Sequence, residues 1–214
     1  MSKIAIVDYG LGNLRSVEKG FLKAGVESII THDEDEIARS SALVLPGVGS
    51  FNDGIKNLSH VKEALDDEVR DGKYLIGICL GMQFLLEESD EGPSITSGLG
   101  YIPGSVMRFK TGGNGGHERL KIPHMGWNSL RITRENPIFK GLEGDDPYVY
   151  FVHSYHAATE EKYILSETTY GYDFPSIVAN EGGNVIGLQF HPEKSGDLGL
   201  RMLKNFVEMA EGGV

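Results

Sequence analysis

The sequence predicts an α/β protein whose doubly wound, mainly parallel central sheet carries helices on both faces, with a smaller antiparallel β section in the second half. Two observations predict this class. Through the first half, short β-rich runs alternate with helical patterns, which is typical of right-handed βαβ units. After Gly98 the chain changes to short strands interrupted by frequent glycine and proline. No linker-like composition divides the chain, so we expect residues 1–214 to form one domain.

The elements of the first half follow from hydrophobic periodicity. Four β-rich runs predict strands at residues 3–7, 27–30, 42–45 and 75–78. Helical patterns predict helices at residues 14–24, 61–70 and 80–88. The stretch 33–39, between two of the strands, is polar and acidic. In a parallel sheet of this kind, functional sites form beyond the carboxyl ends of the strands.

In the second half, the candidate strands are residues 105–109, 148–153, 163–166, 176–179 and 185–190. An amphipathic pattern predicts a closing helix at residues 198–209. The glycine-rich run 111–116 is expected to be a mobile surface loop.

Composition excludes several classes of partner. The 31 acidic and 20 basic side chains give a net charge of −11, which argues against binding to nucleic acid or to an anionic membrane surface. A single cysteine cannot form an internal disulfide, which suits a reducing compartment. The apolar run before Asp8 is too short for a signal peptide, and no stretch is long enough to span a bilayer. We therefore expect a cytoplasmic protein.

The cysteine lies in the run Gly77-Ile78-Cys79-Leu80-Gly81, where a predicted strand ends and a predicted helix begins. A glycine two residues to either side permits a sharp, strained turn that lifts a nucleophile clear of the sheet. Backbone N–H groups at the start of the helix would favour the sulfur anion. A lone cysteine is often only a small buried apolar residue, but this glycine frame predicts a reactive thiolate at Cys79.

A thiolate nucleophile needs a base, and the base needs a group that orients it. The run Gln189-Phe190-His191-Pro192-Glu193-Lys194 follows the last predicted strand, and it places His191 and Glu193 on one side of an extended segment. Glu193 can then accept the Nδ1 proton of His191, which leaves Nε2 free to face Cys79. The alternative is a histidine that caps a strand beside a surface glutamate.

The run Pro46-Gly47-Val48-Gly49 ends the strand that precedes the Cys79 strand along the chain. Its glycines allow a peptide to turn an N–H group toward a developing negative charge. We expect Gly47, Val48 and Gly49 to supply one oxyanion donor and the N–H of Leu80 to supply the second. The alternative is a Pro-Gly turn before a helix.

No motif predicts a cofactor or a metal. The run Gly10-Leu11-Gly12-Asn13-Leu14-Arg15 begins like a dinucleotide fingerprint but has arginine in place of the third glycine. A Gly-Lys-Ser/Thr phosphate loop is absent from the sequence. His153 and His156 lie close together, but no further cysteine or ligand pair completes a zinc site. We therefore expect neither a cofactor nor a metal.

With the motifs at residues 46–49, 77–81 and 191–193 in this order, the chain resembles the class I, triad-type glutamine amidotransferases. Further segments are similar to the glutaminase subunits of imidazole glycerol phosphate synthases, namely residues 8–17, 98–104, 123–128, 150–155 and 189–194. The resemblance covers essentially the whole chain. Two features depart from it. The segment 111–118 is longer and richer in glycine than usual, and His156 replaces what is more often an aromatic residue or another side chain, so it is assigned no role.

The resemblance implies that Cys79 attacks the side-chain amide of L-glutamine and gives a glutamyl thioester and ammonia, while His191 moves protons and Glu193 orients it. It also implies that Gln83 and the Ser154-Tyr155 backbone hold the amino-acid end of glutamine. From the residues alone, Gln83 is equally a solvated helix residue, and Ser154 and Tyr155 are equally ordinary strand residues.

The resemblance further implies a partner, a (β/α)8-barrel cyclase subunit that forms a heterodimer with this chain. The cyclase would receive ammonia through an internal channel, because free ammonia near neutral pH is mostly protonated and no longer nucleophilic. It would make imidazole glycerol phosphate and AICAR in histidine biosynthesis. Trp127, the sole tryptophan, is expected in a Pro- and Gly-flanked loop, where a large aromatic side chain suits a docking anchor. Matching family positions make Trp127, Tyr150 and Lys194 interface candidates, with a core role as the alternative for Trp127.

Three rival hypotheses stay open on the sequence. The first is another class I amidotransferase that serves a different acceptor. The second is a cysteine hydrolase of similar fold, which would cleave peptides or small amides without any partner. The third is a catalytically idle binding subunit, in which a glutamine-like electrophile would leave Cys79 unmodified.

Overall fold

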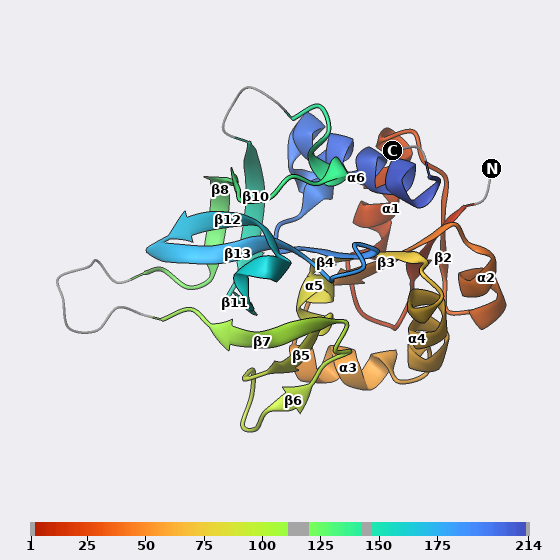
Figure 1. Cartoon of the computed structure of the whole chain (residues 1–214). Helices are drawn as coiled ribbons and strands as arrows, with labels where there is room; N and C mark the ends of the chain where they lie inside the picture. The colour runs from red at the N-terminus through yellow and green to blue at the C-terminus, as the bar shows by residue number, and fades with distance from the viewer. Residues whose placement is uncertain (1–2, 111–119, 143–146, 213–214) are drawn as a thin grey trace.

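The computed structural model describes residues 3–110, 120–142 and 147–212, and within them an eight-stranded sheet forms the centre of the molecule (Figure 1). Its strand order is β2-β1-β3-β4-β14-β13-β12-β9. These strands are β1 (Ile4–Val7), β2 (Ser28–Thr31), β3 (Ala42–Gly47), β4 (Tyr74–Cys79), β9 (Arg131–Ile132), β12 (Ile164–Tyr170), β13 (Tyr172–Ala179) and β14 (Val185–Leu188). The strands from β2 to β14 in this order are parallel, and β13, β12 and β9 add antiparallel pairs.

Two smaller sheets lie beside the central one in the described part of the chain. One pairs β8 (His124–Ser129) with β10 (Tyr148–His153), and the other has the order β11-β7-β5-β6. The strands of the second are β5 (Leu86–Ser89), β6 (Thr96–Ser97), β7 (Ile102–Arg108) and β11 (Tyr155–Ala158). The mainly parallel sheet and the antiparallel section confirm the predicted fold class.

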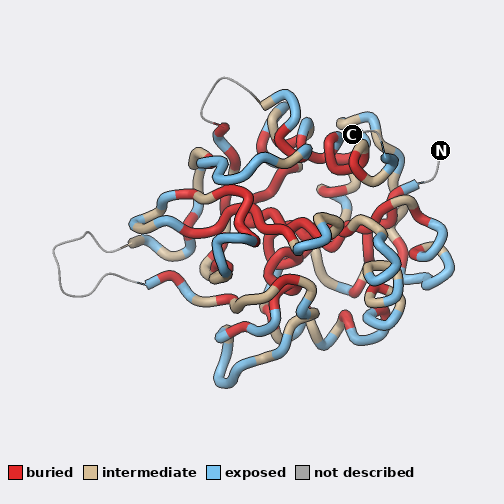
Figure 2. Tube along the Cα trace, in the orientation of Figure 1, coloured by how far each residue is buried: buried red, intermediate tan, exposed pale blue. Residues whose placement is uncertain are grey.

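Helices cover both faces of the sheet because successive side chains of a strand point to opposite faces. Ile4 and Ile6 of β1 belong to the core that α1 (Leu14–Lys23) and α6 (Gly196–Ala210) complete. Ala5 and Val7 belong to the opposite core. The helices on that face are α2 (Glu34–Arg39), α3 (Phe51–Leu58), α4 (Lys62–Arg70) and α5 (Leu80–Phe84). Figure 2 shows the central strands as a buried band between these two layers.

The predicted helix at residues 80–88 was wrong in its second half. The helix ends at Phe84, and the following residues form β5, which pairs in parallel with β7. The N–H groups of Leu99 and Ile102 donate to the carbonyl oxygens of Phe84 (2.8 Å) and Leu85 (3.0 Å). A continuing helix would need both carbonyls for its own hydrogen bonds. The segment that follows β6 therefore ends the helix by taking its acceptors.

Other elements were missed or shifted. The acidic stretch 33–39 contains α2, whose first turn is capped by the Asp33 carboxylate, which accepts from the N–H of Glu36 at 3.0 Å. Neither α3 nor β8 was predicted, and β7 and β13 begin before the predicted strands. The described residues also contain three short 3₁₀ helices that were not predicted: η1 (Pro137–Phe139), η2 (Glu161–Tyr163) and η3 (Pro192–Lys194). The glycine-rich run 111–116 and the longer segment 111–118 lie outside the described residues.

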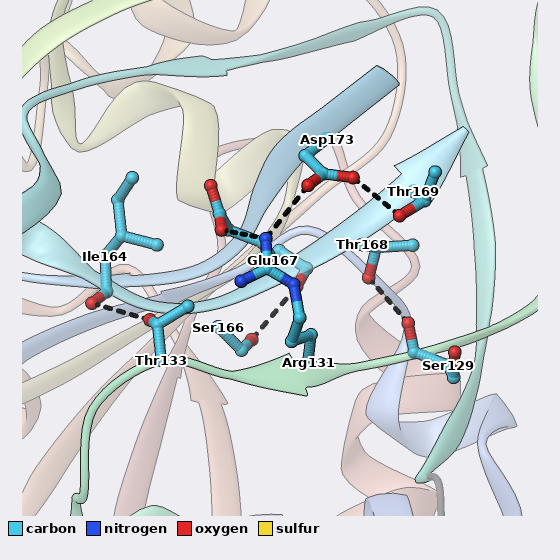
Figure 3. Close-up of polar contacts among 10 residues, drawn as sticks. Ser129, Arg131, Thr133, Ile164, Ser166, Glu167, Thr168, Thr169 and Asp173 are labelled. Atoms are coloured by element: carbon cyan, nitrogen blue, oxygen red, sulfur yellow. Dashed lines mark hydrogen bonds and ion pairs between the residues drawn. The ribbon is translucent and has the colours of Figure 1, made fainter. Parts of the chain in front are cut away.

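The antiparallel edge of the central sheet is joined by polar side chains (Figure 3). Arg131 of the two-residue strand β9 contacts the carboxylates of Glu167 at 2.5 Å and Asp173 at 2.9 Å, so it links β9 to β12 and β13. The hydroxyl of Thr168 donates to the carbonyl of Ser129 at 3.0 Å and ties β12 to the end of β8. None of the helices in the described ranges has the length and apolar character needed to cross a bilayer.

Candidate active site

Cys79 is the last residue of β4, and α5 begins at the next residue. Its backbone has φ 55° and ψ −108°, and it is the one non-glycine residue with positive φ among those described. The turn is possible because two glycines pack against backbone. A Cβ at Gly81 would lie 1.8 Å from the carbonyl oxygen of Leu45, and one at Gly77 would lie 2.6 Å from that of Gly81. The sharp, strained turn that the sequence predicted is therefore present at Cys79.

The sheet register brings His191 to the same rim. β14 pairs in parallel with β4, and Leu188 lies opposite Ile78, so the chain that leaves β14 passes beside Cys79. His191 donates its Nδ1 proton to Oε1 of Glu193 across 2.9 Å. Both side chains are buried, with 3% and 0% of their surface exposed. This burial contradicts the alternative of a strand-capping histidine beside a surface glutamate.

A cavity of about 360 Å³ opens at this rim, and it is lined by both Cys79 and His191. Burial lowers the pKa of His191, but hydrogen bonds and charge interactions with Cys79 and Glu193 outweigh it and raise that pKa to about 9. His191 is therefore an imidazolium near neutral pH, with Cys79 on one side and a carboxylate on the other. A thiol, an imidazole and a carboxylate in this order suit nucleophilic attack on an acyl or amide carbon.

Three of the four predicted oxyanion residues line the cavity, and the fourth lies behind them. Val48, Gly49 and Leu80 line the cavity. Gly47 lies behind them, opposite Cys79 in the β3–β4 register, and a Cβ there would approach the N atom of Gly81 to 2.4 Å. Val48 is 40% exposed, whereas Leu80 is 4% exposed, so the two candidate donors sit in very different surroundings.

The predicted glutamine-binding residues also reach the cavity, which Gln83, Ser154 and Tyr155 help to line. Gln83 is buried rather than solvated, because its Nε2 donates to the Tyr155 carbonyl at 3.0 Å and to Oε1 of Gln189 at 3.3 Å. Gln189 was missed as a site residue. It is fully buried, and its Nε2 lies 4.0 Å from the Cys79 sulfur. Its place in the motif with His191 was the signal that could have found it.

His153 also lines the cavity, and it was missed because the sequence analysis weighed it only as a metal ligand. Its ring and that of His156 both pack against Phe109, with centroids 5.1 Å and 4.8 Å away. Burial lowers the pKa of His153 to about 3, so the ring is neutral. Its Nδ1–H donates to the Tyr155 carbonyl at 2.8 Å, and its Nε2 faces Nδ1 of His124 at 3.0 Å.

Of the predicted interface residues, Lys194 lines the cavity, whereas Trp127 and Tyr150 lie opposite each other on β8 and β10. Trp127 lies in strand β8 rather than in a loop, and its ring is 6.0 Å from that of Tyr150 on β10. Trp127 is 53% exposed, which contradicts a core role. Exposed Met125 lies two residues from it on β8, and exposed Lys194 lines the cavity.

Comparison with known proteins decides the family. The model of the class I glutamine amidotransferase family matches residues 5–210. Two curated relatives named imidazole glycerol phosphate synthase subunit HisH match 98% of this chain over 100% of their own length. That of Methanosarcina acetivorans is 48% identical to this chain, and that of Geobacter sulfurreducens is 47% identical. That of Natronomonas pharaonis is 47% identical over 97% of this chain and 94% of the relative. The chain belongs to the HisH family of class I glutamine amidotransferases.

Solved structures share the fold of this amidotransferase at low identity. A crystal structure described as glutamine amidotransferase superposes with a TM-score of 0.72 at 22% identity, over 98% of this chain and 99% of the other. The structure of PurLQS from Thermotoga maritima gives a TM-score of 0.76 at 19% identity, again over 98% and 99% of the two chains. These structures support the fold, whereas the family model and the curated relatives confirm the family resemblance seen in the sequence.

Proposed function

We propose that this HisH-family amidotransferase hydrolyses L-glutamine to glutamate and ammonia, and passes the ammonia to a (β/α)8-barrel cyclase subunit. The cyclase makes imidazole glycerol phosphate and AICAR in histidine biosynthesis. One observation carries the proposal: Cys79 and His191 line one cavity, and His191 is hydrogen-bonded to Glu193, in a chain 47–48% identical to HisH relatives over nearly its whole length. We also propose that residues 1–214 act as one domain, in the cytoplasm, without a cofactor.

In the proposed mechanism, the Cys79 thiolate attacks the side-chain amide carbon of glutamine and forms a tetrahedral intermediate. The His191 imidazolium gives its proton to the departing nitrogen, and ammonia leaves as the C–N bond breaks. The product is a glutamyl thioester on Cys79. Neutral His191 then takes a proton from water, which attacks the thioester and releases glutamate. Glu193 keeps the Nδ1 proton of His191 in place through both steps.

The remaining cavity residues have proposed roles that follow from their positions. The Leu80 N–H, at the start of α5, and an N–H from the segment Gly47-Val48-Gly49 stabilise the tetrahedral oxyanion. Loss of one such donor typically costs about 10²–10³ in rate. Gln83 holds the Tyr155 carbonyl, as its 3.0 Å hydrogen bond indicates, and the Ser154-Tyr155 backbone binds the amino-acid end of glutamine.

The proposed cyclase-docking surface is the exposed apolar face of the β8–β10 pair. Trp127 and Met125 are 53% and 61% exposed, which is unusual for large apolar side chains unless a partner covers them. Tyr150 packs beside Trp127, and its carbonyl accepts from the N–H of His191 at 3.0 Å, which places this strand next to the site; Lys194 lines the cavity. A partner seated here would close the cavity mouth and receive ammonia before water protonates it.

The decisive experiment measures glutamate production by the purified chain, alone and with the barrel cyclase and its nucleotide ligand. We expect weak hydrolysis alone and faster hydrolysis with the loaded cyclase. Cys79→Ala should abolish hydrolysis but still form the heterodimer, and the complex should then make product only from added ammonium salt. Hydrolysis retained by Cys79→Ala would overturn the mechanism. Equal rates with and without the loaded cyclase would overturn the coupling, and turnover of peptides without any partner would favour the cysteine hydrolase.

A further inference from the structure

Tyr9 is a buried tyrosine next to the active site with no role so far. It follows β1 and is 1% exposed, and its hydroxyl donates to the carbonyl oxygen of Pro46 at 2.6 Å. Pro46 belongs to β3, the strand beside β1 in the sheet. The hydrogen bond therefore joins the carboxyl ends of two neighbouring parallel strands.

The acceptor is the carbonyl that immediately precedes the oxyanion segment. Because a peptide group is planar, fixing the Pro46 oxygen also fixes the direction of the Gly47 N–H. Gly47 is itself closely packed and paired, since a Cβ there would lie 2.4 Å from the N atom of Gly81 and the residue lies opposite Cys79 in the β3–β4 register. The chain is thus held firmly up to Gly47.

Beyond Gly47 the surroundings change abruptly. Val48 is 40% exposed, and Gly49 has φ +107° with nothing within 4 Å of where its Cβ would lie. The peptides on either side of Val48 therefore have space to rotate, whereas the Pro46–Gly47 peptide does not. The boundary between fixed and free backbone lies at the carbonyl that Tyr9 holds.

The Tyr9 hydroxyl is a permanent donor. Burial, together with the nearby negative charge of Cys79, raises the pKa of Tyr9 well above its usual value. The hydroxyl therefore stays protonated at any pH at which the enzyme works. The ring is held separately, by an edge contact with Phe84 at 5.9 Å between centroids. Removal of the oxygen alone should leave the ring in place.

We infer that Tyr9 is a positioning residue for the oxyanion site: its hydroxyl anchors the Pro46–Gly47 peptide, so that only the peptides around Val48 turn when the donor forms. The inference rests on the proposed glutaminase function. Without the anchor, the segment samples more conformations, and fewer of them aim an N–H at the oxyanion. Glutamine binding uses other residues and is not affected.

The test is Tyr9→Phe, with Tyr101→Phe as the matched control. Tyr101 loses a hydroxyl bond of the same 2.6 Å length, to Asp66 on α4, which does not line the active-site cavity. Both variants are measured for kcat and KM of glutamine hydrolysis with the loaded cyclase. We expect Tyr9→Phe to lower kcat about fivefold, the equivalent of one ordinary hydrogen bond, with KM changed less than about twofold. Tyr101→Phe should change neither constant.

A second measurement keeps the inference separate from the proposed function. Hydrogen exchange of the backbone amides of Gly47 and Val48 is followed in both variants and the unmodified protein, without substrate or partner. We expect faster exchange in Tyr9→Phe only. If the unmodified complex does not hydrolyse glutamine, the proposed function fails and the exchange data alone decide the role of Tyr9. Unchanged exchange, or an unchanged kcat in an active complex, would overturn the inference.

Discussion

The strained backbone at Cys79 should cost stability that glycine can restore. Among the described residues it is the one non-glycine residue with positive φ, and its ψ of −108° is far from the left-handed helical minimum. We therefore predict that Cys79→Gly is more stable than Cys79→Ala. The two variants both lack the thiol, so their difference isolates the Cβ atom and the strain it causes.

The expected difference follows from three terms. A non-glycine residue this far from an allowed region costs about 3 kcal/mol, the upper end of the usual range. Glycine loses up to about 1 kcal/mol more chain entropy on folding. The buried methyl group of alanine contributes about 0.8 kcal/mol that glycine lacks. The net gain for Cys79→Gly is about 1 kcal/mol, or about 2–4 °C in midpoint for a chain of this length.

Thermal and urea unfolding of both variants measure this gain. Ala38→Gly is the control, because Ala38 lies exposed in α2. Glycine there should lower stability by about 1 kcal/mol, the ordinary cost in a helix. Opposite signs at the two positions would support the strain argument. If Cys79→Gly unfolds at or below the midpoint of Cys79→Ala, the turn stores no strain at this residue, and the reasoning fails.

Three further predictions concern the site and the sheet edge. Because the pKa of His191 is raised from 6.5 to about 9, its protonation stabilises the fold fully below pH 6.5, and this contribution is lost as pH rises to about 9. Urea titrations from about pH 6 to 10 should show this loss of stability. Glu193→Gln should make the loss smaller and should move the basic limb of kcat/KM to lower pH. Gly81→Ala should destabilise the fold by about 3 kcal/mol or prevent folding, because its Cβ would lie 1.8 Å from the Leu45 carbonyl oxygen. Circular dichroism and denaturant titration measure this loss, and an unchanged free energy of unfolding would contradict the prediction. Arg131→Ala should lower the free energy of unfolding by less than about 1 kcal/mol in the same titration, since the Arg131 side chain is 58% exposed. A loss of several kcal/mol would mean that β9 is held mainly by this residue.

The parallel pairing of β1 to β4 could be predicted because each of these strands and its crossover are close in sequence. The same rule predicted that the motifs at residues 46–49 and 77–81 meet at one rim, and the register of β3 and β4 places Gly47 opposite Cys79. The proposed triad of Cys79, His191 and Glu193 was predicted from chemistry rather than from periodicity. A framed thiol needed a base, and one motif in the chain offered a base with its own carboxylate.

The errors have a common physical cause, which is contact with segments elsewhere in the chain that local sequence does not reveal. Helix α5 ends early because Leu99 and Ile102 take its carbonyls, and nothing in residues 80–88 signals that competition. β8 was missed because the proline and glycine around Trp127 favour a loop, whereas the strand forms through its pairing with β10. Burial of Gln83 was left open for the same reason, since Tyr155 and Gln189 become its neighbours only in the folded sheet.

The place of β14 in the sheet also constrains how the protein becomes active as it is synthesised. It lies between β4 and β13 and is the last strand in the described part of the chain. A nascent chain that stops before β14 has its thiol but lacks the histidine, and the flank of β4 stays open to unwanted strand pairing. Reactivity therefore switches on only when late residues insert beside early ones. A split protein, cut at the exposed turn before β14, would be inert as two halves and would report their reassembly by the return of ammonia release.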